Sequence, residues 1–297
     1  MTASGRVHLV DGTWELFRAH YAKRPGHLDP KGRERKATVG VVYSMLRLLE
    51  ADEKEKPTHI AIAFDNPIES FRNDLFPGYK TSEGVEPALL AQFDAVEEAA
   101  RALGMVVWPM DKWECDDGLA SGAAKFRDQV EQVRICSPDK DLGQCIRGRH
   151  VVTLDRMRDR ETDEAGLLDL RGIEPRSIPD FLALTGDTAD GIPGVPGFGE
   201  VGASAIIGKW KTIEAIPSDP ALWNVKVRGA DRLALELSRH RDEAMLYKKL
   251  ATLIEDVPLR ESLADLEWRG VPRAAFSAWC DDVGASESLR QRPRRFQ

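Results

Sequence analysis

The sequence predicts an α/β fold, in which a parallel twisted sheet is followed by a helical region. Short apolar runs typical of buried strands alternate with helical patterns through the first two-thirds of the chain, which favours a mostly parallel sheet covered on both faces. After about residue 175, strand signals become scarce. Several predicted strands end at an acidic residue. Because loops leaving the carboxyl ends of parallel strands converge on one crevice, we expect these acids to meet there.

Each element of the first region has a local signal. Apolar runs predict strands at residues 7–10, 59–64, 105–108, 133–136 and 150–154. Helical spacing of apolar residues predicts a helix capped by Thr38, a helix over 88–103 that ends at Gly104, and a helix over 116–127. Residues 66–87 contain three prolines and two glycines, which is typical of a mobile or arched segment.

The rest of the chain is predicted to be mainly helical. The segment PRSIPDFLALTGD predicts a helix that leads into a Gly/Pro-rich turn. Further helices are expected near residues 200–209, 231–247 and 273–282. These patterns divide the chain into an α/β domain at 1–175 and a helical region at 176–297.

Composition and cysteine usage limit the class of protein. Of the 297 residues, 42% are hydrophobic and 31% are charged, as in ordinary globular proteins. No run of 18 apolar residues predicts a membrane span, and the N-terminus lacks a signal-peptide pattern. The four cysteines form no C-x-x-C pair. We therefore expect a reduced, cytoplasmic protein without a structural zinc site.

Positive charge is concentrated in two places. The net charge of −7 would argue against binding of nucleic acid, but local patches rather than net charge meet phosphates. Residues 18–36 contain seven Lys or Arg against two acids, and four arginines lie in residues 290–295. The alternative interpretation is a solvated loop for the first patch and a frayed tail for the second.

Nine carboxylates, several of them directly after predicted strands, are the candidate metal ligands. They are Asp11, Asp65, Glu114, Asp116, Asp117, Asp139, Asp141, Asp187 and Asp190. Clustered like charges repel unless cations neutralise them. Carboxylate oxygens suit Mg²⁺ or Mn²⁺ better than zinc. A site of two or more such ions activates water for in-line displacement at phosphorus, so the acids indicate phosphodiester hydrolysis.

Individual acids also have structural explanations. Asp11 and Asp65 can be helix caps or Asx turns, and acids at 114–117 can simply complement a helix dipole.

The most specific segment is Gly186–Gly199, where an Asp-x-x-Asp pair runs into a turn with four more glycines before the next helix. Such a turn exposes backbone N–H groups that cradle a phosphate. A plain interhelical turn is the alternative.

Five ordered motifs carry a family resemblance. They are LVDGTW, AFDN with ESFRNDLFPGYK, ECDDGLAS, SPDKDLGQ and GDTADGIPGVPGFGEVGA. In this order they resemble the 5′-nuclease (flap endonuclease) superfamily. The resemblance is greatest to the bacterial type, which comprises the 5′–3′ exonuclease domain of DNA polymerase I and its stand-alone relatives. We expect the free-standing form, without a polymerase module, because the chain is similar in kind to the stand-alone flap endonucleases of actinobacteria.

The resemblance implies specific roles. The nine acids match the family's metal cluster, with Asp116 and Asp139 among the catalytic residues. The segment of about 68–103 corresponds to a helical arch. Lys80 would contact the scissile phosphate, Arg72 would offset developing charge, and Tyr79 would stack on a base. A helix–three-turn–helix (H3TH) element would hold duplex phosphates, and often K⁺, through Gly194, Val195, Gly197, Phe198 and Gly199.

Departures from the family pattern concern phosphate binding. Glu83 lies near a position where Arg is common, Val201 lies where Lys usually follows, and Gly191 lies where Asn is common. Each lost positive charge is expected to reduce the salt slope of DNA binding by about one unit. Flap preference and processivity therefore stay open. No acid is missing, so the metal chemistry is expected to be intact.

The resemblance implies a metal-dependent 5′-flap endonuclease and 5′–3′ exonuclease that acts in DNA replication and repair. Its expected partner is DNA with a 5′ flap or 5′ end at a duplex junction, with RNA-containing 5′ ends as a secondary substrate. A monomer without membrane contacts, associated with the nucleoid, is expected. One alternative is a non-catalytic DNA-structure-binding protein of the same fold. A second is a PIN-type RNase, which generally lacks the H3TH element.

Overall fold

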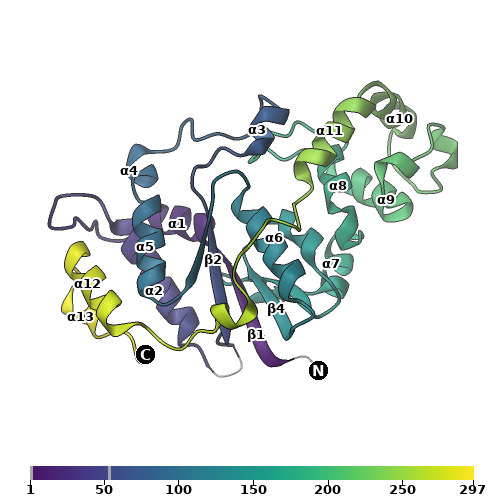
Figure 1. The fold of residues 1–297 in the computed structure, drawn as a ribbon. Helices are drawn as coiled ribbons and strands as arrows, with labels where there is room; N and C mark the ends of the chain where they lie inside the picture. Colours follow the sequence, from purple (N-terminus) through teal and green to yellow (C-terminus); the bar gives the residue numbers. More distant parts are fainter. Residues whose placement is uncertain (1–2, 53–54) are drawn as a thin grey trace. The chain divides into compact units, whose positions relative to one another are not determined.

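The structure, a computed structural model, describes residues 3–52 and 55–297. The chain forms two compact units, neither of which is continuous in sequence (Figure 1). The first contains the residues up to Ile68, Ser82–Ser137 and Glu255–Gln297; the second contains Glu69–Thr81 and Pro138–Ile254. The sequence-based boundary at residue 175 lies within the second unit.

Four parallel strands form the sheet of the first unit. They are β1 (Ala3–Asp11), β2 (His59–Asp65), β3 (Val106–Met110) and β4 (Val130–Cys136). Their order is β3-β2-β1-β4, and Val10 of β1 lies beside Ile62 on one side and Cys136 on the other. The apolar runs of β1 and β2 are fully buried, as expected for parallel strands covered on both faces. The predicted α/β architecture is confirmed.

Helices cover this sheet on both faces (Figure 1). Helix α6 (Cys115–Phe126) packs on β1, β2, β3 and β4. Helices α1 (Gly12–Tyr21), α2 (Lys36–Leu49) and α5 (Phe93–Ala102) pack against one another or against β2 and β3. The remaining helical segments of this unit are α4 (Pro87–Leu90), η5 (Leu263–Leu266), α12 (Arg273–Val283) and α13 (Glu287–Arg290).

The second unit is mainly helical. Its helices are α3 (Phe71–Leu75), α7 (Glu164–Arg171), α8 (Ile178–Thr185), α9 (Glu200–Trp210), α10 (Ala230–Arg239) and α11 (Arg241–Ala251). Strands β5 (Val151–Asp155) and β6 (Arg160–Thr162) form an antiparallel pair. Short 3-10 helices complete the unit: η1 (Asp141–Cys145), η2 (Pro175–Ser177), η3 (Ile213–Ala215) and η4 (Pro220–Leu222).

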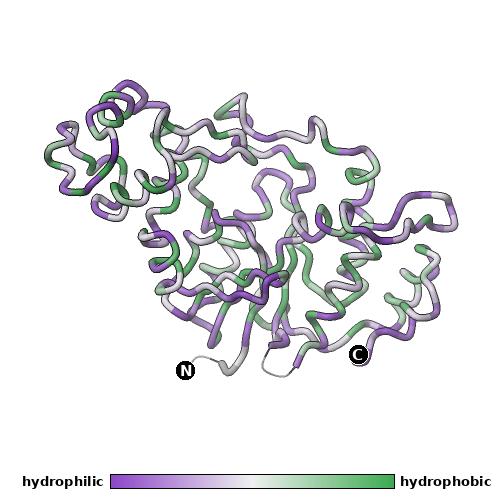
Figure 2. Tube along the Cα trace, turned by 180° about the vertical axis from the view of Figure 1, so that it is seen from behind, coloured by the Kyte–Doolittle hydropathy of each residue, from purple (hydrophilic) through white to green (hydrophobic). Residues whose placement is uncertain are grey.

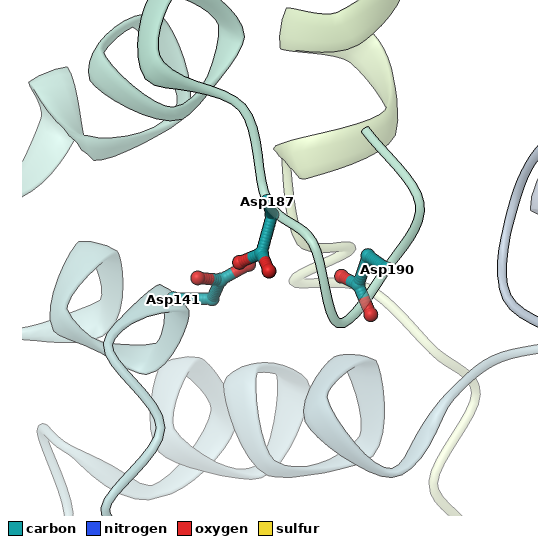
Figure 3. A group of neighbouring side chains, drawn as sticks. All are labelled: Asp141, Asp187 and Asp190. Carbon is teal, nitrogen blue, oxygen red and sulfur yellow. The ribbon is translucent and has the colours of Figure 1, made fainter. Parts of the chain in front are cut away.

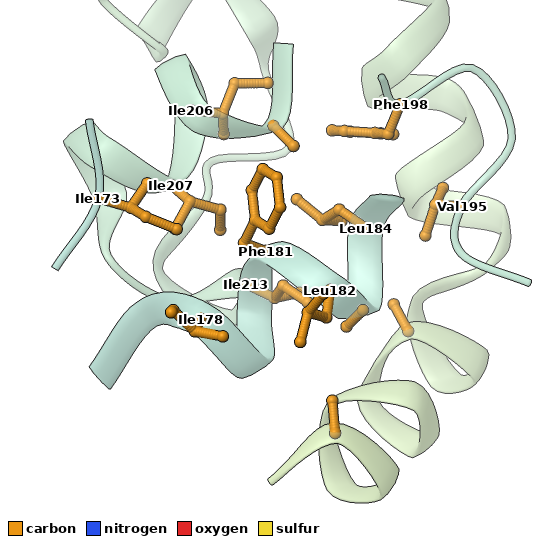
Figure 4. Close-up of a cluster of buried hydrophobic side chains, with 14 of the residues drawn as sticks. Ile173, Ile178, Phe181, Leu182, Leu184, Val195, Phe198, Ile206, Ile207 and Ile213 are labelled. Carbon is orange, nitrogen blue, oxygen red and sulfur yellow. The ribbon is translucent and has the colours of Figure 1, made fainter. Parts of the chain in front are cut away.

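Helix α8 is the centre of the second unit's core. It packs on α9 and α11. In Figure 4, Phe181 of α8 lies among Leu184, Ile206 and Ile207, and all four side chains are buried. The turn that follows α8 contributes Val195 and Phe198 to the same core. Burial of these side chains fixes the positions of α8, α9 and the turn between them, which carries Asp187 and Asp190.

Helix boundaries differ from the prediction where distant residues intervene. Helix α2 begins at Lys36 rather than at a Thr38 cap, because the side chain of Gln92 accepts hydrogen bonds from the backbone N–H groups of Ala37 and Thr38. Gln92 lies where the predicted 88–103 helix is interrupted. The structure has two helices there, α4 before Gln92 and α5 after it. The predicted 231–247 helix is likewise divided at His240.

Helix α1 was absent from the prediction. The residues after β1 were expected to form a basic loop, but the helix begins at Gly12, directly after the strand.

Within residues 3–52 and 55–297, no helix combines the length and apolar character needed to cross a bilayer.

Candidate metal centre and active site

The first group of acids gathers at the N-terminus of α6. Asp11 ends β1 and Asp65 ends β2, which are neighbouring strands. Oδ1 of Asp65 accepts a hydrogen bond of 2.6 Å from the backbone N–H of Cys115, the first residue of α6. The Cys115 sulfur lies 3.6 Å from Oδ1 of Asp11. The structure therefore brings together the ends of two strands and the start of a helix, as the strand pattern predicts.

Glu114 and Asp117 form a capping box at the same helix terminus. The backbone N–H of Glu114 donates to Oδ2 of Asp117 over 3.0 Å, and the Glu114 side chain accepts from the N–H of Asp117. Both side chains are buried, whereas Asp116 is partly exposed. The spacing of three residues thus places Glu114 and Asp117 together, with Asp116 on a different face.

Negative charge accumulates around Cys115. Burial raises the pKa of the Cys115 thiol well above its ordinary value, and the carboxylates of Asp11, Asp65 and Asp116 raise it further. The thiol is therefore protonated at neutral pH. An environment that disfavours one more negative charge this strongly is one in which a cation is favoured.

Two hydroxyl groups near these acids were not foreseen from the sequence. Oγ of Ser137 donates to Oδ2 of Asp11 over 2.7 Å, and the hydroxyl of Thr13 accepts from the backbone N–H of Asp65 over 2.8 Å. Asp11 also caps α1 through a 2.8 Å bond from the N–H of Trp14. Asp11 is therefore a helix cap, the structural alternative considered above, and its second oxygen is oriented by Ser137.

The second group of acids consists of Asp141, Asp187 and Asp190. One carboxylate oxygen from each lies within 4.8 Å of the others. Figure 3 shows the carboxylates of Asp141 and Asp187 turned toward each other, with Asp190 beside them on the turn that follows Asp187. Asp141 and Asp187 are buried and Asp190 is half-buried. Asp139 adjoins this group, because its Oδ1 accepts from the N–H of Asp141 over 2.9 Å.

The backbone of the turn after α8 holds Asp187 and Asp190 in place. Asp187 and Ile192 exchange two backbone hydrogen bonds of 2.8 Å, which close a tight loop around Asp190. At Gly191 the φ angle is +74°, and a Cβ atom there would lie 2.2 Å from the carbonyl oxygen of Gly78. Only glycine fits such a position. The loop and the segment that carries Lys80 therefore pack backbone to backbone.

Two lysines neutralise part of this acid group. Nζ of Lys140 lies 2.8 Å from Oδ2 of Asp187, and Nζ of Lys80 lies 3.0 Å from Oδ1 of Asp190. Burial alone would lower the pKa of Lys140, but its bond to Asp187 and the charges of Asp141 and Asp139 raise it. Lys140 is therefore cationic at neutral pH.

Burial and neighbouring charge perturb Asp141 of the second group. Burial raises the pKa of its carboxyl well above the ordinary value, and the charges of Asp139, Asp190 and Asp187 add to this effect. Lys140 acts in the opposite direction. Oδ1 of Asp141 is also buried and has no hydrogen-bond partner among the described residues.

A divalent cation fits these residues. A buried carboxylate oxygen without a partner is costly unless a ligand satisfies it. The available donors are carboxylate oxygens only, which is the ligand set of hard cations. Asp141, Asp187 and Asp190 would hold such an ion, and its charge would offset the repulsion among them.

Tyr79 does not occupy the position expected for a base-stacking residue. Its side chain is 4% exposed and belongs to the hydrophobic core of the second unit. Its hydroxyl donates to Oδ2 of Asp190 over 3.2 Å. The ring has no free face for a base, because burial in the core covers it. The structure therefore corrects the expected role: Tyr79 positions Asp190.

Arg72 is buried as well, which corrects its expected contact with a phosphate. The side chain is 1% exposed. Its Nε donates to the carbonyl oxygen of Leu250 and its Nη2 to that of Thr252, at the C-terminal end of α11. These bonds satisfy helix-end carbonyls that would otherwise lack donors. Arg72 therefore anchors α3 to the C-terminal end of α11.

The segment between Arg72 and Lys80 is held by a motif that was not recognised in the sequence. Ser70 and Asn73 form a capping box at the start of α3. The Asn73 side chain also donates to the carbonyl oxygen of Lys80 over 2.9 Å. The Ser-x-x-Asn spacing resembles the capping-box pattern and was the available signal.

The Gly-rich turn presents its backbone rather than its side chains. Val195 and Phe198 are buried in the core, so neither side chain is available to DNA. The N–H groups of both are also bonded within the protein, to the carbonyl oxygens of Leu184 and Val195 respectively. Gly197 and Gly199 are exposed, and Gly199 precedes α9 as its N-cap. Any phosphate or K⁺ contact at this turn would involve the exposed glycines and the start of α9.

Most cations of residues 18–36, which run from the end of α1 through a loop to the start of α2, are engaged in ion pairs within the first unit. Arg33 and Arg35 contact Asp29, Lys31 contacts Asp282, and Arg18 contacts Glu15. The loop is largely hydrophilic (Figure 2), and Lys23 and Arg24 are exposed. The C-terminal arginines are likewise not a frayed tail, since Arg290 bonds Asp281 and Arg295 lies over the ring of Trp268.

Comparison with known families gives a match over most of the chain. Residues 6–171 match the 5′-3′ exonuclease N-terminal resolvase-like domain, and residues 173–274 match the 5′-3′ exonuclease C-terminal SAM fold. The chain belongs to the 5′-3′ exonuclease family. The resemblance inferred from the five motifs is thereby confirmed.

Relatives within the 5′-3′ exonuclease family are of two lengths. DNA polymerase I of Bacillus caldotenax is 32% identical over 292 residues, which cover 96% of this chain but 32% of that protein. The chain therefore spans about a third of the length of such relatives. The 5′-3′ exonuclease of Aquifex aeolicus is 28% identical over 264 residues, which cover 88% of this chain and 86% of that protein.

Solved structures share the fold of this 5′-3′ exonuclease family member. The bacteriophage T5 flap endonuclease, solved as a pseudo-enzyme-product complex with DNA and metal ions, gives a TM-score of 0.62 at 16% identity over 96% of this chain and all of that chain. The catalytic core of Rad2 in complex with a DNA substrate gives 0.61 at 13% identity over 98% of this chain and 91% of that one. At such identities these matches establish the fold.

Proposed function

We propose that this protein is a divalent-metal-dependent, structure-specific 5′ nuclease that hydrolyses phosphodiesters in DNA. The observation that carries the proposal is the group of Asp141, Asp187 and Asp190, whose ligand oxygens lie within 4.8 Å of one another and include a buried oxygen without a protein partner. Membership of the 5′-3′ exonuclease family supports the reaction. Its substrates are 5′ flaps and 5′ ends at duplex junctions, in replication and repair.

All nine acids take part in metal binding under this proposal. Asp11, Asp65 and Glu114–Asp117 form the group at the α6 terminus, and Asp139, Asp141, Asp187 and Asp190 form the other. Bound Mg²⁺ or Mn²⁺ would supply a nucleophilic water and stabilise the charge that develops at the scissile phosphate. The chain's own contribution is to orient the carboxylates through donors on Ser137, Cys115 and Tyr79, while Thr13 holds the backbone of Asp65.

Lys80 is the residue that we assign to the scissile phosphate. Its ammonium group rests on Asp190 at 3.0 Å and its side chain is 26% exposed, so it can leave the carboxylate for a phosphate oxygen when substrate binds. Arg72, Asn73 and the backbone bond from Lys80 N–H to Asp190 fix the segment that carries it. Arg72 is therefore a positioning residue in this scheme.

The Gly-rich turn is proposed to bind the duplex. The exposed backbone at Gly197 and Gly199 and the start of α9 offer N–H groups and a helix dipole to phosphates, with K⁺ as a further ligand of the turn. A 5′ end containing RNA is a secondary substrate. We propose a monomer that acts on chromosomal DNA in the cytoplasm.

Cleavage of a 5′-labelled flap tests the function. The protein would be incubated with Mg²⁺, with Mn²⁺ and with chelator, beside the Asp139→Asn and Asp187→Asn variants. A metal-dependent cut at the junction, absent in both variants, supports the proposal, and release of the intact flap identifies the endonuclease mode. Mononucleotide products alone would indicate a 5′ exonuclease. Retained cleavage in both variants contradicts the metal assignment.

A non-catalytic DNA-structure-binding protein is the alternative outcome of the same experiment. Tight binding of the flap without cleavage under either metal would establish it. No structural feature of the described residues favours it, because all nine acids are present and three of them fit a cation.

A further inference from the structure

Lys140 places a positive charge on the second acid group. Its Nζ lies 2.8 Å from Oδ2 of Asp187, and it follows Asp139 and precedes Asp141 in the chain. The Asp187 side chain is 7% exposed, whereas that of Lys140 is 38% exposed. The ammonium group therefore contacts a buried carboxylate of the proposed cation site and has solvent into which it can move.

A divalent ion and this ammonium group cannot both have full use of Asp187. They compete for the lone pairs of the same carboxylate, and two positive charges a few ångströms apart repel each other. The two lysine–carboxylate pairs differ in their proposed roles. Lys80, paired with Asp190, is assigned to the phosphate, whereas Lys140 has no role in the proposed chemistry. We therefore attribute the pair of Lys140 with Asp187 to the negative charge of the acids.

In the absence of metal, the acid group needs another source of positive charge. Three carboxylates share a small, mostly buried space, and their mutual repulsion opposes folding. Lys140 offsets part of that repulsion through the pair with Asp187. The same pair must be broken, or at least lengthened, before Asp187 can bind a divalent ion.

We propose that Lys140 is a built-in counter-cation that a divalent ion displaces from Asp187. Lys140 then stabilises the metal-free fold and weakens the affinity of the site for metal. This inference rests on the proposed function, because it takes Asp187 as a metal-binding residue. It concerns the stability of the metal-free protein and its affinity for metal rather than the cleavage of DNA.

Mn²⁺ binding measured by electron paramagnetic resonance tests the competition directly. Lys140→Gln removes the charge and keeps a polar side chain of similar reach, and Lys140→Arg keeps the charge. Lys140→Gln is expected to bind Mn²⁺ about fivefold more tightly than the original protein, the effect of losing one partly exposed ion pair. Lys140→Arg should bind as the original protein does. Equal or weaker binding by Lys140→Gln overturns the proposal.

Thermal unfolding provides a readout that does not depend on DNA. In chelator, Lys140→Gln should melt below the original protein, because the acids lose their counter-charge. With saturating Mg²⁺ the difference should disappear, since the ion replaces the lysine. An equal loss of melting temperature in both conditions would mean a purely structural role and would contradict the proposal.

Lys248 provides the matched control for that experiment. It is an ion-paired lysine of the same unit, with Nζ at 2.8 Å from both Asp180 and Glu214, and its side chain is 22% exposed. Neither partner belongs to the acid group around Asp187. Lys248→Gln should therefore lower the melting temperature by the same amount with and without Mg²⁺.

A spectroscopic measurement covers the case in which Lys140→Gln does not fold. Lysines of the original protein can be labelled as ¹³C-dimethyl-lysine, and the Lys140 signal is assigned as the one missing from Lys140→Arg. Addition of Mg²⁺ should shift this signal toward that of a solvated lysine. An unchanged signal at saturating metal would show that the pair persists, and the displacement would be refuted.

The two proposals fail in different ways. If the original protein binds no Mn²⁺, the metal-dependent function itself is wrong. If it binds Mn²⁺ and cleaves the flap, but Lys140→Gln behaves as the original protein in binding and melting, only the counter-cation role is wrong.

Discussion

The hydroxyl group of Tyr79 donates a hydrogen bond of 3.2 Å to Oδ2 of Asp190 from a ring that is 4% exposed. The other oxygen of the same carboxylate bonds Lys80, the residue next to Tyr79. Two consecutive residues therefore hold the two oxygens of one acid. This pairing connects the segment 69–81 to the turn after α8.

Tyr79→Phe separates positioning of Asp190 from base stacking. The ring and its packing are kept and only the hydroxyl is lost. Because a hydrogen bond to a charged group is removed, we expect the cleavage rate to fall about tenfold, with unchanged KM for the flap substrate. Single-turnover cleavage measures this. A stacking role predicts no loss in Tyr79→Phe, since phenylalanine stacks as well, so an unchanged rate would contradict the positioning role.

Arg72→Met is expected to destabilise the protein. The carbonyl oxygens of Leu250 and Thr252 lose their buried donors, which should lower the free energy of unfolding by about 3 kcal/mol. Urea denaturation measures the change. Arg239→Met is the control, because Arg239 is 62% exposed in a surface pair with Glu236 and its loss should cost less than about 0.5 kcal/mol. Equal effects in the two variants would refute the anchoring role of Arg72.

Gly191→Ala tests the close approach of two backbone segments. The new Cβ would meet the carbonyl oxygen of Gly78 at 2.2 Å at a φ angle of +74°, so we expect a loss of about 2 kcal/mol or more. Gly199→Ala serves as the comparison, because its φ is −96° and no atom lies within 4 Å of its Cβ position. Chemical denaturation of both variants measures the difference. Similar stability of the two would argue against the contact.

The 22–35 loop should lose its order in acid. Burial would raise the pKa of Asp29, but hydrogen bonds from Arg33 and from the backbone N–H of Lys31 outweigh it and lower the pKa to about 2. The folded pKa lies below the unfolded value of about 3.9. The contribution of Asp29 is therefore complete above about pH 4 and is lost as the pH falls toward 2.

Amide hydrogen exchange at Lys31 and Arg33 measures this loss, because both N–H groups donate to Asp29. Their protection factors should fall between about pH 4 and pH 2. In Asp29→Asn they should be low and independent of pH over the same range. Protection that persists to pH 2 in the original protein would show that Asp29 does not hold the loop.

Local signals were sufficient for the parallel sheet and for the family. Apart from His8 and His59, the runs that became β1 and β2 are apolar because both faces are buried, and the motifs identified the family. What could not be predicted depends on partners distant in sequence. Gln92 begins α2 from another segment, and nothing in the residues around Thr38 shows this.

Burial was the second property that the sequence did not reveal. Arg72 and Tyr79 are polar residues in a motif associated with substrate, so an exposed position was the natural expectation. The structure buries both, because Arg72 satisfies carbonyl groups of α11 and Tyr79 fills the core of the second unit. A residue type indicates what a side chain can bind, but only the fold determines whether the ligand is DNA or the protein itself.

The discontinuity of the two units has a consequence for synthesis on the ribosome. The chain passes from one unit to the other after residues 68, 81, 137 and 254. The N–H of Trp268 donates to the carbonyl oxygen of Thr58, and the Trp268 indole donates to that of Leu103, so the first unit is completed only by residues near the C-terminus. The first unit therefore cannot be completed on the ribosome until residues 255–297 have emerged, so a truncation that removes them leaves this unit unfinished.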